Sequence, residues 1–175
     1  MAVDHVKSTS VTGLDASPAV SLTAGEGAPA PVKCVTGIAV GVASSSIDST
    51  YQLVRVPSTA IIKSMWFATT TQAAGAMDIG VYYATDGLIG KPTTLLAAAA
   101  IDQDFFSSAL VLTTITLQEA MLESAVYTPA KWNQPLWQAV GLSADPGGNF
   151  DICGTITTAI TTGTGTMALN VTYTD

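Results

Sequence analysis

Alternation of apolar and polar residues near the end of the chain is the feature that most limits its fold. Apolar side chains occupy every second position over residues 166–174, and nearly the same spacing covers 150–157. A period of two is typical of β-strands that bury one face. The segment between them, residues 161–165, contains two glycines and favours a turn. The sequence therefore predicts a closing antiparallel hairpin whose outer face is rich in threonine.

The composition favours a protein that works inside an assembly. At 175 residues the chain is long enough for one domain with its own core. Apolar residues make up 48% of it and charged residues only 11%, against about 25% charged in an average globular protein. Most of its surface must then consist of Ser, Thr, Ala and Gly, and such a surface tends to associate.

The charge pattern argues against nucleic-acid and membrane partners. The formal net charge is −7, and the 6 basic residues are scattered along the chain. Direct nucleic-acid binding needs a basic cluster, so none is expected. No apolar run approaches the roughly 18 residues of a membrane span, and the N-terminus lacks the layout of a secretory signal. We expect a protein that is made and used without export through the secretory pathway.

Further strands are predicted upstream of the closing hairpin. Residues 51–56 and 61–70 are rich in β-branched and aromatic side chains, and the short link between them fits a hairpin. Residues 77–83 alternate and precede an Asp-Gly turn signal. A strand-like run also covers 35–42. The count reaches about seven to nine short strands, which suits two packed antiparallel sheets, as in a jelly roll or a related β-sandwich.

Short helices are expected in the connections between the strands. The expected helical segments are 94–100, 102–110, 118–124 and 136–140. Asp102 is a candidate N-cap for the second of them. Pro135 suits the start of the last one, and Gly141 its C-terminal cap. The fold class predicted from these patterns is all-β, with short connecting helices.

The first 48 residues differ from the rest. They are weakly periodic and include a Gly- and Pro-rich stretch at 24–31. We predict an extended N-terminal arm over residues 1–48 with one or two short strands, with simple disorder as the alternative. Residues 49–175 are predicted to form the jelly-roll-like β-sandwich domain.

No set of side chains suits catalysis or cofactor binding. His5 is the only histidine and lies in the predicted arm, which argues against a catalytic triad and a tetrahedral zinc site. Cys34 and Cys153 are expected as small core residues rather than as a disulfide. We therefore predict a protein that is not an enzyme and has no catalytic, cofactor-binding or metal-binding residues.

Three acidic groupings have plainer explanations than metal binding. They are Asp102 with Asp104, Glu119 with Glu123, and Asp145 with Asn149 and Asp151. The first pair suits a helix N-terminus, and the second suits a solvated helix face. The third could offer oxygens to calcium, but these residues are also common in turns.

Aromatic residues leave one binding hypothesis open. Trp132 lies between Lys131 and Asn133 in a polar loop and is the tryptophan most expected to be exposed. It could stack on a sugar together with Tyr82 or Tyr83, although packing is the plainer expectation.

Several segments, taken in order, resemble small virion proteins of tailed bacteriophages that are encoded among head genes. These segments are 7–9, 13–18, 49–58, 78–82, 102–109, 135–142 and 171–173. The resemblance covers nearly the whole chain and implies a capsid decoration (cement) protein, trimeric and with a jelly-roll core. It implies no catalytic residues.

Three functional hypotheses follow. The leading one is a decoration protein on the head exterior, which binds the major capsid protein and itself and uses its arm to lace onto a neighbour. The second is a glycan-binding virion protein for host-surface attachment, and the third is a head–tail or tail component. An exposed cluster of Trp132 with Tyr82 or Tyr83 would favour the second.

Overall fold

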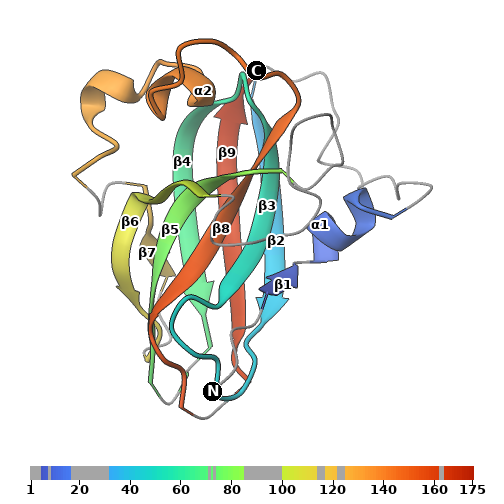
Figure 1. The fold of residues 1–175 in the computed structure, drawn as a ribbon, viewed down its shortest axis with the longest axis vertical. Coiled ribbons are helices and arrows are strands. Elements are labelled where there is room, and N and C mark those ends of the chain that lie inside the picture. Colours follow the sequence, from blue (N-terminus) through green and yellow to red (C-terminus); the bar gives the residue numbers. More distant parts are fainter. Residues whose placement is uncertain are drawn as a thin grey trace.

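Two β-sheets face each other across one apolar core (Figure 1). The computed structural model describes residues 5–7, 9–16, 32–70, 72, 74–84, 100–113, 117–121, 125–161 and 164–175. One sheet has five strands in the order β1 (His5–Lys7), β3 (Thr50–Pro57), β8 (Asn149–Thr158), β5 (Ala76–Tyr83) and β6 (Ala100–Val111). The other has four, in the order β2 (Lys33–Val40), β9 (Thr166–Thr174), β4 (Ile61–Thr69) and β7 (Leu117–Glu119).

The strand order is that of a jelly roll. Of the eight strands β2 to β9, the first, eighth, third and sixth form one sheet, and the second, seventh, fourth and fifth form the other. Every step along the chain from β2 to β9 crosses between the sheets, except the step from β5 to β6. The predicted all-β sandwich is confirmed. β1 is an addition to the jelly roll, and it pairs with β3 in parallel.

Both predicted hairpins are wrong. β8 and β9 lie in opposite sheets, and so do β3 and β4. The alternation in β9 is confirmed, because Met167, Leu169 and Val171 are all fully buried. Alternation of apolar and polar residues shows that a strand has one buried face, but it does not identify the strand with which it pairs. A short link serves equally well to connect neighbouring strands and to bridge two sheets that lie about 10 Å apart.

The predicted helix at 102–110 is also wrong, because these residues belong to β6. Phe105 and Phe106 are fully buried and pack edge-on against each other at 4.9 Å between ring centroids. Both rings also contact Tyr127. Pairing with β5 and this aromatic packing outweigh the local preference for a helix. Three register shifts along the β5–β6 pair, with Ala109 at a φ of 56°, account for the irregular sequence pattern.

The remaining helix predictions have mixed outcomes. The helix near Pro135 is confirmed as α2 (Leu136–Ala139), with Pro135 as its N-cap residue and Gly141 at a φ of 86° just after its end. A 3₁₀ turn, η2 (Pro129–Lys131), precedes it. Residues 117–119 form β7 rather than a helical turn. Residues 94–99 and 122–124 lie outside the described residues. No described helix is both long and apolar enough to cross a bilayer.

The N-terminal elements pack against the sandwich of their own chain. α1 (Thr9–Leu14) follows β1, and both lie at the side of the sandwich where β2 and β3 run (Figure 1). Val11 of α1 is fully buried. β2 falls within the predicted arm, and all eight of its residues pair with β9 without a register shift. Any truncation meant to remove the arm alone must therefore stop before Lys33.

The two cysteines differ in their surroundings. Cys153 is buried, as predicted, whereas Cys34 is exposed on β2, so its predicted core position is wrong. Burial raises the pKa of the Cys153 thiol well above its usual range, and the nearby Asp151 carboxylate adds to this rise. Both thiols are free.

We predict that Gly37→Ala destabilises the fold far more than Gly154→Ala. A Cβ at Gly37 would overlap the Leu53 carbonyl oxygen of β3, which is fixed by the backbone. A Cβ at Gly154 would meet the flexible end of the Met77 side chain instead. Urea unfolding should show that the free energy of unfolding falls by about 2–3 kcal/mol for Gly37→Ala and by about 1 kcal/mol or less for Gly154→Ala. Equal losses would contradict the close approach of β2 to β3.

Candidate functional site

Of the three aromatic residues in the glycan hypothesis, Tyr82 is not available for stacking. Trp132 is exposed (38%), but Tyr82 is buried, and its hydroxyl hydrogen-bonds with the Thr155 hydroxyl at 2.6 Å. Burial raises the pKa of Tyr82, although the hydrogen bond with Thr155 opposes the rise. Tyr83 is half-buried and packs against the Phe150 ring. Tyr82 therefore cannot offer a stacking face to a sugar.

The acidic residues that the structure describes have local partners, and Glu123 lies outside the described residues. Asp151 is held by Arg55, and one oxygen of Asp145 accepts hydrogen bonds from the Ser58 hydroxyl and the Gly147 backbone N–H. Burial raises the pKa of Asp102, and the neighbouring Asp104 adds to this rise. No group of three or more His, Cys, Asp or Glu residues suited to an ion occurs among the described residues.

The outer face of the four-stranded sheet carries a row of apolar side chains across all four strands. Ile38 of β2 is opposite Ala168 of β9, which is opposite Ala68 of β4, which in turn is opposite Leu117 of β7. Ile38 and Leu117 are exposed (45% and 67%). Large side chains thus stand at both ends of the row, with two alanines between them.

A second row lies directly beside the first. Trp66 of β4 is opposite Asn170 of β9 on one side and Glu119 of β7 on the other, and its side chain is exposed (41%). Asn170 donates hydrogen bonds through its amide nitrogen to the Thr36 hydroxyl at 2.7 Å and to the Cys34 sulfur at 3.1 Å. These contacts hold the amide across β2. Trp132 is exposed as expected, but Trp66 is exposed as well, so the expectation that Trp132 alone among the tryptophans is exposed is wrong.

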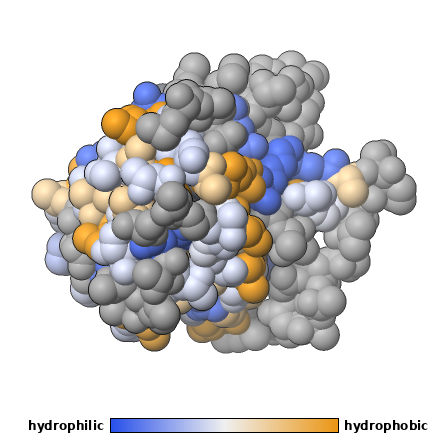
Figure 2. All heavy atoms as spheres, turned by 90° about the horizontal axis from the view of Figure 1, so that it is seen from below, coloured by the Kyte–Doolittle hydropathy of each residue, from blue (hydrophilic) through white to orange (hydrophobic). Residues whose placement is uncertain are grey.

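Few charges stand on this face. Among the outward-facing residues of its strands that the structure describes, Lys63 and Glu119 are charged, and both have local partners. Lys63 donates a hydrogen bond to the Asn133 side chain, and Glu119 accepts one from the Met121 backbone N–H. Figure 2, which looks onto one end of the sandwich, shows apolar patches beside both pale, weakly polar patches and hydrophilic ones. We call the outward-facing side of β2, β9, β4 and β7 the outer face.

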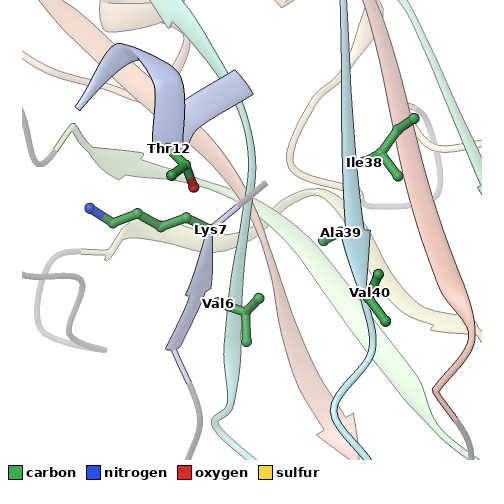
Figure 3. Close-up of a pocket in the computed structure, with 6 residues that line it drawn as sticks. All are labelled: Val6, Lys7, Thr12, Ile38, Ala39 and Val40. Carbon is green, nitrogen blue, oxygen red and sulfur yellow. The ribbon is translucent and has the colours of Figure 1, made fainter. Parts of the chain in front are cut away.

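An apolar groove lies at the edge of the sandwich between the N-terminal elements and β2. Val6, Lys7 and Thr12 line one side, and Ile38, Ala39 and Val40 line the other (Figure 3). Its volume is about 430 Å³. The Lys7 side chain points away from β2 (Figure 3) and its amine pairs with Asp15 at 2.6 Å. The groove therefore offers mainly apolar contacts.

Ion pairs centred on Arg55 hold the N-terminal wall of this groove in place. The Arg55 guanidinium donates to both oxygens of Asp151 at 2.7 and 3.0 Å, and to Asp15 at 2.6 Å. Gln52 also donates to Asp151. Arg55 and Asp151 are register partners on β3 and β8, whereas Asp15 follows α1. Arg55 therefore connects the five-stranded sheet to the N-terminal elements.

The pKa of Asp15 is lowered by this arrangement. Burial alone would raise it, but hydrogen bonds and charge attraction from Lys7 and Arg55 outweigh the burial. Burial would likewise lower the pKa of Arg55, but Asp151 and Asp15 outweigh it and raise that pKa. Asp15 and Arg55 are therefore both charged at neutral pH.

Sequence reasoning missed the outer face and the groove because both depend on strand order. The Thr-rich outer side of β9 was predicted, but the neighbours that bring Ile38, Trp66 and Leu117 beside it were not. Each of these large apolar residues lies at an outward position of its own strand, but only the strand order brings the three onto one surface.

Comparisons with known proteins show the fold. No protein-family model matches the chain, and no curated protein matches it. A chain from a structure described as the capsid of Ralstonia phage GP4 is similar over 98% of this chain and 97% of its own length, with a TM-score of 0.58 and 14% identity. A chain from the cyanophage Pam1 capsid asymmetric unit covers 91% and 95% at 17% identity, but its TM-score is only 0.41.

We predict that Asp15→Asn loosens the N-terminal elements without unfolding the sandwich. The substitution removes the negative charge that Arg55 and Lys7 share, and such charged hydrogen bonds contribute about 1.5–3 kcal/mol. Hydrogen exchange at residues 5–7 and 9–16 should accelerate by about tenfold or more, while exchange in β8 stays slow. Lys7→Met is the matched control, because it removes only the more exposed partner and should have a smaller effect. Unchanged exchange in Asp15→Asn would show that the Arg55–Asp15 ion pair does not hold the N-terminal elements in place.

We predict that acid detaches β1 and α1 from the sandwich. The pKa of Asp15 in the folded protein is below its usual 3.8. Its contribution to the stability of the docked N-terminal elements is therefore fully present above pH 3.8, and it is lost as the pH falls through the lowered pKa. Amide NMR signals of β1 and α1 should therefore shift in wild-type protein only below about pH 4. In Asp15→Asn this component of the acid response should be absent.

Proposed function

We propose that this chain is a phage capsid decoration protein that binds the outside of the major capsid protein shell and stabilises the head. The supporting observation is the concentration of exposed apolar side chains on and next to β2, where Val32, Ile38, Val40 and Val42 are exposed in a chain with few charges. A free copy leaves these side chains in water, and binding removes them from it at about 25 cal/mol per Å². The jelly roll, shared over nearly the full length with a chain of a phage capsid structure, supports the same role.

The edge of β2 is the part best suited to contact the shell. β2 is eight residues long, has a regular register, and lies at the end of its sheet. Such an edge can accept a strand from a partner through backbone hydrogen bonds, while alternate side chains provide specificity. The groove beside it, with Val6 and Val40 on opposite sides, can receive the side chains of that strand.

The proposed mechanism is mechanical rather than chemical. Each bound copy contacts shell subunits, and its binding free energy is added to the stability of the shell by mass action. A larger number of weak contacts then resists expansion and disruption of the head. No bond is made or broken in this role.

Co-sedimentation with purified heads that lack the protein tests the proposal. We expect saturable binding, with a copy number that matches the symmetry of the shell and a higher melting temperature for the decorated heads. Val40→Asp should weaken binding at least tenfold, because it places a charge beside the groove. Val111→Asp is the matched control, since Val111 is similarly exposed (47% against 56%) but lies on β6 at the other side of the sandwich.

Two results would contradict parts of this proposal. If wild-type protein does not bind heads under conditions in which it is folded, the decoration role is wrong. Truncation of residues 1–31 removes β1, α1 and with them one wall of the groove, but leaves β2 intact. Unchanged binding by that variant would exclude both lacing and a role of the groove, and would leave the edge of β2 as the contact.

A further inference from the structure

We infer that the outer face is a self-association surface, on which two copies of this chain pack against each other across a two-fold axis. This contact is independent of the proposed function, because it forms between free copies and needs no capsid. It is centred on β9 and β4, whereas the proposed shell contact uses the edge of β2 and the groove beside it. Three observations support a second copy as that occupant.

The first observation is the shape of the face. Trp66 projects from β4, and two residues further along the same strand Ala68 lies beside Ala168. The two alanines form a shallow depression between the larger Ile38 and Leu117. A protruding side chain and a depression therefore stand next to each other on one surface.

Such a pair is complementary to itself. In a two-fold contact, a residue that touches a second residue in the partner is touched by that second residue in return. Trp66 of each copy can then enter the Ala68–Ala168 depression of the other, with the axis between them. Tryptophan is among the residues that contribute most to interfaces when it is fully buried.

The second observation is the charge of the face. The whole chain carries −7, so two copies repel each other over most of their surfaces. The outer face is an exception, because Lys63 and Glu119 are its charged outward residues within the described strands, and their charges cancel. Close approach of two copies here brings together no excess of like charge.

The third observation is the size of the face. β9 and β4 have nine residues each and β2 has eight. At about 3.3 Å per residue and about 4.8 Å per strand, the face measures roughly 30 Å by 15–19 Å, or about 500 Å². Two such faces bury about 1,000 Å², which is near the lower limit of a specific interface. The expected association is therefore weak in solution and becomes effective where copies are concentrated, as on a shell.

Sedimentation equilibrium of the purified full-length chain, over about 1 µM to 1 mM, tests the inference. We expect reversible association in steps of two, whether the basic unit is a monomer or a trimer formed through another surface. Trp66→Ala should weaken this step at least tenfold, and Ala68→Asp should abolish it. Trp132→Ala is the matched control, because Trp132 is exposed to a similar degree but is not part of the outer face, and it should leave the step unchanged.

Cross-linking tests the symmetry of the contact. In a Cys34→Ser background, Ala168→Cys places one thiol of each copy near the expected axis, so a short bis-maleimide cross-linker should join two copies into a covalent dimer. Thr158→Cys, on β8 in the other sheet, should not. A wild-type chain that shows no pairing step at any concentration would overturn the inference. So would a pairing step that both Trp66→Ala and Ala68→Asp, shown to be folded by circular dichroism, leave unchanged.

Discussion

Burial of alternating side chains between the two sheets is the interaction on which the rest of this structure depends. Met167, Leu169 and Val171 of β9 are fully buried, together with Phe67 of β4, and they face the equally buried residues of the other sheet. At about 1.5–3 kcal/mol for each large apolar side chain, the inner face supplies most of the folding free energy. The outward residues of the same strands contribute little to that term. Their identity is therefore open to selection for contacts with other molecules.

The five-stranded sheet uses its outward side differently. There, Arg55 and Asp151 form a buried two-point ion pair, and burying two charges is costly unless their hydrogen bonds are satisfied. Gln52 donates to the same carboxylate, and Asp15 of the N-terminal segment accepts a further hydrogen bond from the guanidinium. The ion pair therefore specifies where the short β1 and α1 elements bind on the sandwich. Three paired residues in β1 could not specify that position by themselves.

The sequence was sufficient for the fold class but not for the strand partners. Alternation in β9 correctly identified its buried residues, and Pro135 with Gly141 correctly bounded α2, because both signals are local. The two hairpins and the helix at 102–110 were wrong because strand pairing is decided by packing between distant segments. The absence of a catalytic or metal-binding set remains a prediction. The outer face could not be recognised before the order β2-β9-β4-β7 placed Ile38, Ala168, Ala68 and Leu117 in one row.

The edges of the two sheets differ in a way that bears on assembly. Exposed edges invite pairing with other chains, and proteins commonly protect them by shortness, irregularity or charge. β1 and β7 have three residues each, and β6 has three register shifts and carries Asp102 and Asp104. β2 has none of these protections, since it is long and regular, and its single charge, Lys33, is paired with Asp175 at one end. A solitary protein with such an edge would risk uncontrolled association. Among the described residues, no strand pairs with the second side of β2, and this edge beside an apolar groove is the one that the proposed shell contact would use.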